Sequence, residues 1–330
     1  MLAELLAGGR VLLADGATGT NLFEMGLANG DAPELWLDAH PDRIRALHRA
    51  FVGAGADIIL TNSFGANARR LMLHGMQHRA RELNRIAASL AREVADASGR
   101  RVAVAGSVGP TGDLLAPLGP LTEEEAAGVF AEQMEGLREG GADLAWVETM
   151  SAPEEMRAAA TAAARTGMPW TLTASFDTAG RTMMGLTPEA FAAFAAALPV
   201  PPLAIGANCG VGASDLVASL LGIAGGGAAL PVIAKANAGI PVVQGDRVVY
   251  SGTPRTMEVY AHLAIDAGAR IVGGCCGTSP AHLAAMRRAV DDHRAGNAPP
   301  DLAAIVAALG PLVQPPNAGG EKRQGRRRGG

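Results

Sequence analysis

The sequence predicts an α/β protein of the (β/α)8 TIM-barrel class. Short apolar runs alternate with amphipathic or Ala-rich stretches along most of the 330 residues, which is typical of parallel strands joined by right-handed helical crossovers. Eight such units fill about 290 residues, the size expected of an eight-stranded barrel. An open doubly wound sheet shows the same alternation and is the alternative architecture.

Eight segments have the length and apolar character of buried strands, and helical patterning separates them. The expected strands are residues 11–15, 57–62, 102–107, 143–148, 170–176, 203–209, 231–236 and 270–275. The expected helices include residues 42–52, 80–97, 123–139, 153–166 and 188–197.

A weak internal repeat supports this division. The segments GAGADIIL, EGGADLAWV and DAGARIVGG begin at residues 53, 139 and 266. Each predicts the end of a helix, a glycine in the left-handed conformation, and then the start of a strand. Glycine is favoured there because it accepts a positive φ without a Cβ clash.

We expect the barrel to occupy residues 1–294 and a C-terminal extension to occupy residues 295–330. The extension is rich in Pro, Gly and charged residues, and residues 301–309 have the pattern of one short helix. Its last stretch, EKRQGRRRGG, lacks apolar residues, so a disordered basic tail is expected. Solvation of this tail is favoured over contact with an acidic partner.

Composition argues against several classes of function. A net charge of −4 and a pI near 6.0 disfavour a nucleic-acid-binding protein, which would be basic. No run of eighteen apolar residues is present, so no membrane-spanning helix is expected. The N-terminal stretch lacks the basic segment of a signal peptide. Three cysteines without export signals fit a cytoplasmic protein with free thiols.

The three cysteines carry the strongest chemical signal. Cys209 ends the apolar run LAIGANC, and Cys275 and Cys276 end the run ARIVGGCC. Strand ends meet at one face of a barrel, so three thiols there predict a zinc site with three sulfur ligands. Inert buried thiols and a disulfide between the adjacent cysteines are the alternatives. Because there is no fourth cysteine, an open position for a thiol substrate is expected.

Polar residues also stand at other strand ends, where functional side chains of such barrels lie. Asp15, Asn62, Ser107, Glu148 and Asn237 are the candidates. Helix capping is the alternative role for Asn62 and Ser107, and a turn before glycine is the alternative for Asp15 and Asn237.

Seven segments resemble the zinc-dependent homocysteine S-methyltransferases. That family includes betaine–homocysteine methyltransferase, S-methylmethionine-dependent enzymes and the homocysteine half of cobalamin-dependent methionine synthase. The segments are LLADGATGTNLF, ILTNSFGAN, GSVGPTGD, WVETMSAPEE, IGANCGVG, KANAGIP and IVGGCCGT. The resemblance covers roughly residues 12–290, and NCG followed by GGCCGT is its most specific part.

This resemblance implies methyl transfer to the thiol of L-homocysteine, which gives L-methionine. It implies that Zn²⁺ is bound by Cys209, Cys275 and Cys276 and activates the substrate thiol. It also implies that Asp15 and Glu148 lie at the amino-acid end of homocysteine, where a substrate ammonium needs an anionic partner.

Further contacts are expected around these residues. Backbone amides of the loop that begins Gly16, Ala17 and Thr18 are expected to hold the substrate carboxylate, because oriented amides bind anions. Asn62 and Ser107 are counted among the substrate-binding residues. The side-chain oxygen of Asn237 is the candidate for the fourth zinc position before the thiol arrives.

The methyl donor is harder to predict. The chain is too short to hold the additional modules of cobalamin-dependent methionine synthase, so we expect a free-standing barrel. Betaine is the favoured donor, and aromatic faces would hold its quaternary ammonium. Candidate aromatics are Trp36, Phe64, Trp146 and Phe176. The alternatives are S-methylmethionine, another sulfonium compound, or methylcobalamin on a separate corrinoid protein in a split methionine synthase.

Two other classes of function are also considered. A non-catalytic, regulatory zinc-binding barrel would not need the pair of carboxylates. A zinc hydrolase would prefer histidine and carboxylate ligands around a water molecule. The resembling family contains monomers and oligomers, so a homo-oligomer is an open alternative.

Overall fold

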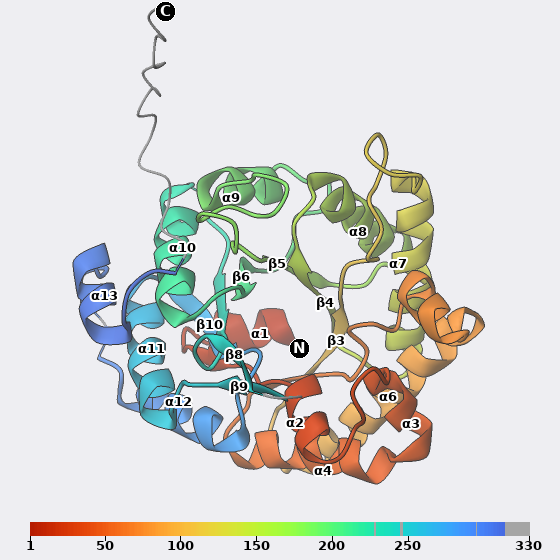
Figure 1. Cartoon of the computed structure of the whole chain (residues 1–330), viewed down its shortest axis with the longest axis horizontal. Coiled ribbons are helices and arrows are strands. Elements are labelled where there is room, and N and C mark those ends of the chain that lie inside the picture. Colours follow the sequence, from red (N-terminus) through yellow and green to blue (C-terminus); the bar gives the residue numbers. More distant parts are fainter. Residues whose placement is uncertain (228, 245–246, 295, 314–330) are drawn as a thin grey trace, which may run out of the picture.

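The structure is a (β/α)8 barrel, as the sequence predicts (Figure 1). This computed structural model describes residues 1–227, 229–244, 247–294 and 296–313. Eight parallel strands pair in the order β1-β10-β7-β6-β5-β4-β3-β2. A bridge between Ala14, which follows β1, and Ile58 of β2 joins the two ends of this order. The strands are β1 (Leu12–Leu13), β2 (Ile58–Leu60), β3 (Ala103–Val108), β4 (Leu144–Met150), β5 (Trp170–Ala174), β6 (Ile205–Cys209), β7 (Val232–Ala236) and β10 (Ala269–Gly274).

Helices surround the strands, and the five helices expected by range are confirmed to within one residue at each end. The barrel helices are α4 (Pro41–Gly53), α6 (Ala80–Asp96), α7 (Glu123–Glu139), α8 (Pro153–Thr166), α9 (Pro188–Ala196), α10 (Ala213–Gly225), α11 (Pro254–Asp266) and α12 (Pro280–Asp292). Shorter helices are α1 (Leu2–Ala7), α2 (Gly19–Glu24), α3 (Trp36–Ala39), α5 (Ala68–Leu71) and α13 (Leu302–Leu309), with 3-10 turns at Pro33–Leu35, Met72–His74 and Gln77–Arg79.

The repeat glycines behave as the sequence predicts. Gly55, Gly141 and Gly268 have φ values of 103°, 93° and 100°, so each adopts a conformation that disfavours other residues. Each therefore lets the chain leave a helix and enter the next strand within a few residues.

The hairpin that follows β7 is not among the predicted elements. A two-stranded antiparallel hairpin, β8 (Pro241–Gln244) and β9 (Arg247–Tyr250), is inserted between β7 and α11. Its sequence signal is two Val-Val pairs on either side of Gly-Asp, which is typical of a hairpin. The expected strand at 11–15 is also shorter in the structure, because only Leu12 and Leu13 stay in the ladder.

The barrel interior is apolar near its amino-terminal end and polar at its carboxyl end. Leu2 and Leu5 of α1 pack with the inward side chains of the strands, and Figure 1 shows α1 within the ring of helices. Along β4 the inward residues Leu144 and Trp146 are followed by Glu148. The apolar layers thus support a polar floor at the end where functional residues of this fold lie.

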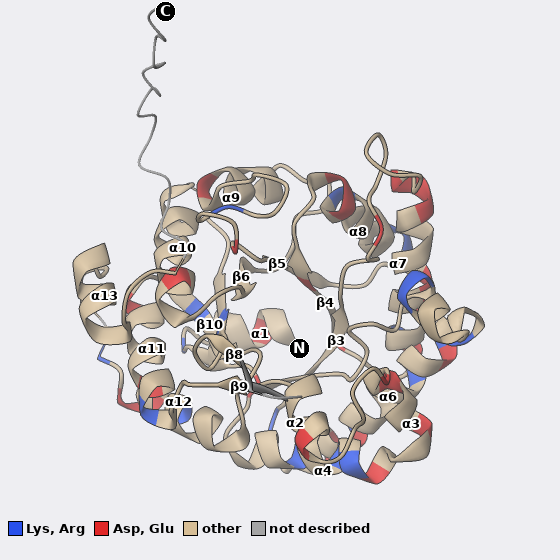
Figure 2. Cartoon of the chain, viewed as in Figure 1, with Lys and Arg blue, Asp and Glu red and all other residues tan. Residues whose placement is uncertain are grey.

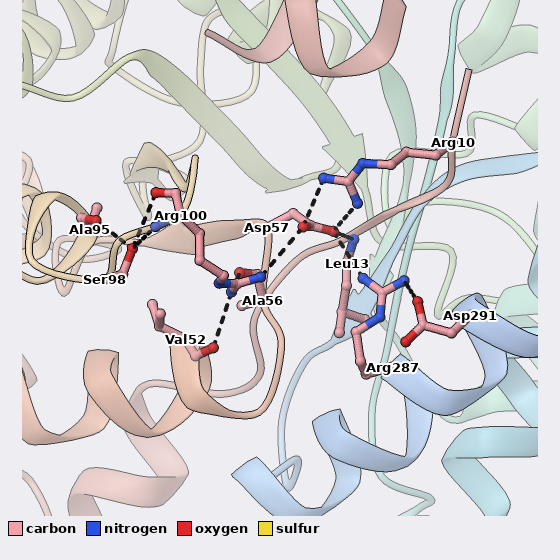
Figure 3. Close-up of polar contacts among 10 residues, drawn as sticks. All are labelled: Arg10, Leu13, Val52, Ala56, Asp57, Ala95, Ser98, Arg100, Arg287 and Asp291. Atoms are coloured by element: carbon pink, nitrogen blue, oxygen red, sulfur yellow. Dashed lines mark hydrogen bonds and ion pairs between the residues drawn. The ribbon is translucent and has the colours of Figure 1, made fainter. Parts of the chain in front are cut away.

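At the opposite end of the barrel, Asp57 holds several elements together (Figure 3). Its carboxylate accepts two hydrogen bonds from Arg10, at 2.9 and 3.0 Å, and one from Arg287 at 3.1 Å. It also accepts a bond from the buried N–H of Leu13 at 2.9 Å. Residues at the amino-terminal face of such barrels serve stability rather than chemistry.

Asp57→Ala is expected to lower the free energy of unfolding by about 3 kcal/mol, because it strands a buried N–H and removes the partner of a half-buried arginine. Urea denaturation measures this change. Asp96→Ala is the control, since Asp96 forms an exposed pair with Arg92 and should change stability by no more than about 0.5 kcal/mol. Equal effects of the two substitutions would contradict the role given to Asp57.

Charges are distributed over the outer helices, with both signs interspersed (Figure 2). Within the described residues, no helix combines the length and hydropathy that a bilayer crossing requires. The predicted helix at 301–309 is confirmed as α13, and the chain after it contacts α10, where Val313 N donates to Asp215. The predicted basic tail over residues 314–330 lies outside the described residues.

Candidate metal and substrate site

The three cysteines converge at the carboxyl end of the barrel, as the sequence predicts. Cys209 ends β6, and Cys275 and Cys276 follow β10, with β7 between the two strands. The Sγ atoms of Cys209 and Cys276 are 4.0 Å apart, and all three Sγ atoms lie within 4.8 Å of one another. All three are free thiols, so the alternative of a disulfide between the adjacent cysteines does not apply.

An unusual backbone conformation presents Cys209. Its φ is 62°, a left-handed value that is costly for any residue with a Cβ and that clusters at functional sites. Gly210 follows with a φ of 73°. Cys209 still pairs with Ala236 of β7, so the ladder holds the turn in place. Local strain at this position is therefore balanced by the sheet.

The cluster fits a zinc ion. Tetrahedral zinc with Zn–S bonds of 2.3 Å separates its sulfur ligands by about 3.8 Å, close to the 4.0 Å between Cys209 and Cys276. Contact with Cys275 lowers the pKa of Cys209, but contact with Cys276 and burial outweigh it and raise this pKa to about 12. Contact with Cys209 and burial also raise the pKa of Cys275. Thiols packed so closely need a cation to ionise together.

Asn237 lies beside this cluster. It follows β7, and its Nδ2 donates to the carbonyl of Gly210 at 2.8 Å. Its Oδ1 is buried and has no hydrogen-bond partner among the described residues. A buried acceptor without a partner is unusual, and this one suits the predicted role of a temporary metal ligand. The alternative of a left-handed turn at Asn237 does not apply, since its φ is not positive.

Glu148 and Ser107 form the polar floor of the site. Ser107 Oγ donates to Glu148 Oε1 at 2.5 Å, across the neighbouring strands β3 and β4. Burial raises the pKa of Glu148, while the ammonium of Lys235 and the bond from Ser107 oppose the shift. Thr149, next in the chain, has a φ of 65°. Ser107 thus orients a carboxylate and does not cap a helix.

Asp15 is paired within the protein. Its Oδ1 accepts a bond from Lys235 Nζ at 2.9 Å, and its Oδ2 accepts one from the N–H of Leu60 at 2.7 Å. Asp15 is 1% exposed and Lys235 is 2% exposed. Both carboxylate oxygens of Asp15 are therefore engaged by the chain itself.

A cavity of about 1380 Å³ opens above this floor. It is larger than most small-molecule pockets, which measure roughly 300–1,000 Å³. Among the predicted residues, those that line it are Gly16, Ala17, Thr18, Asn62, Ser107, Glu148, Cys209, Cys275 and Cys276. Asp15 and Asn237 lie beneath this surface and are not part of the lining.

Two residues predicted to contact the substrate, Asn62 and Ala17, already use polar groups in bonds within the chain. Asn62 Nδ2 donates to the carbonyl of Pro33 at 2.8 Å, so Asn62 anchors a loop of the cavity wall rather than capping a helix. The N–H of Ala17 donates to Thr278 Oγ1 at 3.0 Å, which leaves the later amides of this loop as the candidates for a substrate carboxylate. Gly16 packs so tightly that a Cβ there would lie 2.8 Å from Thr278.

Comparison with known proteins identifies the family. The model of the family described as homocysteine S-methyltransferase matches residues 12–290, which contain all the thiols and carboxylates described above. The chain belongs to the homocysteine S-methyltransferase family. The resemblance found in the sequence is thereby confirmed, over the same range.

Relatives of this family member include two mycobacterial proteins named methionine synthase. The protein of Mycobacterium tuberculosis (strain ATCC 25618 / H37Rv) is 33% identical over an aligned length of 297, and the match covers 85% of this chain and 25% of the relative. The protein of Mycobacterium leprae (strain TN) is 30% identical over an aligned length of 341, and the match covers 96% of this chain and 28% of the relative. This chain therefore spans about a quarter of the length of these relatives.

Solved structures of the family agree with the fold. The homocysteine methyltransferase MmuM of Escherichia coli, in its metallated form, superposes with a TM-score of 0.72 at 27% identity, covering 86% of this chain and 98% of MmuM. Its oxidized form gives a TM-score of 0.71 at 26% identity, covering 84% and 95%.

This homocysteine S-methyltransferase family member also uses residues that sequence reasoning missed. Lys235 pairs with Asp15, and Asn208 holds the strained Thr149, accepting from its N–H at 2.8 Å. Asn208 Nδ2 also lies 3.9 Å from the Cys275 Sγ. The sequence does hold a signal for each residue. Lys235 is the one charged residue in the apolar run VIAKA, and Asn208 directly precedes the candidate zinc ligand Cys209.

The predicted aromatic residues do not form one cage in this family member. Trp36 is buried against His40 and Arg43, and Phe176 packs edge-on against Phe191. Trp146 lies inside the barrel with Lys235 Nζ 5.7 Å from its ring centre. Of the four, Phe64 alone lines the cavity, where Phe23 and Tyr250 also lie.

Proposed function

We propose that this protein transfers a methyl group to the thiol of L-homocysteine with the help of zinc, giving L-methionine. The observation that carries the proposal is the cluster of Cys209, Cys275 and Cys276 at the wall of a cavity whose floor holds Glu148. Membership of the homocysteine S-methyltransferase family supports it.

The cysteines, with Asn237 beside them, would hold the zinc ion. When bound, zinc lowers the pKa of a thiol ligand and so supplies a thiolate nucleophile at neutral pH. Glu148 binds the α-ammonium of homocysteine, and its bond from Ser107 keeps the carboxylate aligned. The loop after Ala17 receives the α-carboxylate. Together these contacts fix the sulfur so that it forms an S–C bond to the methyl group while the bond from the methyl group to its donor breaks and its electron pair leaves with the donor. Fixing the sulfur lowers the entropic part of the barrier.

We infer that the donor is methylcobalamin carried by a corrinoid protein or module, rather than betaine. Three of the four aromatics expected to hold a quaternary ammonium pack elsewhere, and of the four only Phe64 lines the cavity. The cavity is wide for a donor the size of betaine. The two mycobacterial relatives are named methionine synthase, although this chain spans only a quarter of each.

A methionine-formation assay tests both parts of the proposal. Zinc-loaded protein is given homocysteine and, separately, methylcobalamin, betaine, S-methylmethionine, dimethylsulfonioacetate or S-adenosylmethionine. Among these donors, only methylcobalamin is expected to support turnover. Turnover with betaine would overturn the donor and keep the reaction, whereas no turnover together with no binding of homocysteine would overturn the reaction. Binding of homocysteine to the zinc-loaded protein is measured in parallel by calorimetry.

A further inference from the structure

Lys235 is an unusual residue for this chain. The sequence contains 26 arginines but only two lysines, Lys235 and Lys322. Lys235 lies inside the barrel on β7, in a strand whose other residues are apolar, and it is 2% exposed. An ammonium in such a place costs free energy unless it is paired, so its partners define what it does.

Those partners are the two carboxylates of the site. The Nζ of Lys235 is 2.9 Å from Asp15 Oδ1, and the charge of Glu148 also acts on it. Burial lowers the pKa of Lys235, but the charges of Asp15 and Glu148 outweigh burial and raise it. The face of the Trp146 ring, 5.7 Å away, adds a weaker attraction for the cation.

Asp15 is not exposed to the cavity in this arrangement, and its carboxylate is bonded within the chain. Lys235 takes one carboxylate oxygen, and the N–H of Leu60 takes the other. Asp15 does not line the cavity, whereas Glu148 and Lys235 do. The backbone of Asp15 is equally fixed, because its N–H donates to Ile58 and its carbonyl accepts from Gly274.

We propose that Lys235 is a positioning residue that pairs with Asp15, so that Glu148 alone receives the α-ammonium of homocysteine. Asp15 then acts through Lys235, by holding this ammonium away from Glu148. One uncompensated carboxylate remains for one substrate ammonium, which avoids burying a second unpaired charge. This inference rests on homocysteine being the substrate.

The test compares homocysteine with 4-mercaptobutanoate, which lacks only the amino group. The ratio of their dissociation constants on zinc-loaded protein, measured by calorimetry, is the amine preference. Asp15→Asn leaves Lys235 unpaired beside Glu148, so the amine preference should fall about tenfold. Removing both charges with Asp15→Asn and Lys235→Met together should restore it to within about threefold of the wild type.

Glu148→Gln removes the proposed partner of the substrate ammonium and serves as the reference. It should give the largest loss of amine preference among these variants. If Asp15 contacted the substrate ammonium directly, the double variant would lose the preference as Glu148→Gln does, and the inference would be overturned. Should Asp15→Asn fail to fold, the comparison of wild type, double variant and Glu148→Gln decides the same question. A zinc-loaded wild type that binds no homocysteine would overturn the proposed function, and this inference with it.

Discussion

Cys276→Ala should remove zinc binding and methionine formation together. Two thiols of the cluster would remain, and a site with two ligands holds zinc poorly. Loss of a residue that only hydrogen-bonds to a metal ligand lowers metal affinity by up to about 100-fold. Loss of a ligand itself is expected to lower the affinity for zinc by more than that. Competition with a chromophoric chelator measures the affinity, and the methionine assay measures the activity.

Thr166→Ala, at the end of α8, is the control for this experiment. Thr166 Oγ1 donates to the carbonyl of Ala162 and contacts the sulfur of Met134, away from the cysteine cluster, so zinc affinity and activity should match the wild type. Full activity of zinc-free Cys276→Ala would remove the metal from the proposed reaction.

Glu148→Gln should weaken the binding of homocysteine by about 30-fold while zinc stays bound, because the substrate ammonium loses its charged partner in a buried site. Burial raises the pKa of Glu148 above its usual range. The wild-type affinity should therefore decline as the pH is lowered through that pKa and the carboxylate takes up a proton, and the glutamine variant should lack this component. Calorimetry on zinc-loaded protein at several pH values measures both effects.

Glu155→Gln provides a matched control, since Glu155 is also a buried glutamate with a raised pKa, caused by burial. Its carboxylate accepts bonds from the N–H and the hydroxyl of Thr111, at 2.7 and 2.6 Å, and it does not line the cavity. Homocysteine affinity should be unchanged in this variant. An equal loss in both variants would indicate a general effect of buried charge rather than contact with the substrate.

Most of the fold was predictable because barrel strands and helices leave a strong local pattern. The alternation of apolar runs and helical stretches predicts β and α segments without tertiary information. The thiol cluster was also predictable, since a parallel barrel brings all its strand ends to one face. In each of these cases the information lies within one segment or in the topology.

The pairing of charges inside the barrel was not predictable in this way. Lys235 and Asp15 meet across the interior from β7 and the end of β1, which are not neighbouring strands. Their contact depends on strand register and side-chain length, which no local pattern encodes. For the same reason, the sequence resemblance implies a substrate contact for Asp15, whereas in the structure its carboxylate accepts bonds from Lys235 and Leu60.

The cluster around Asp57 has a consequence for substitutions at the site. Asp57 stands just before β2 and Asn62 just after it, so one short strand separates a residue that secures the fold from one that shapes the cavity. Substitutions in the loops at the cavity can therefore change the site while the opposite face keeps the chain foldable. Stability and the properties of the site thus depend on opposite ends of the same strands.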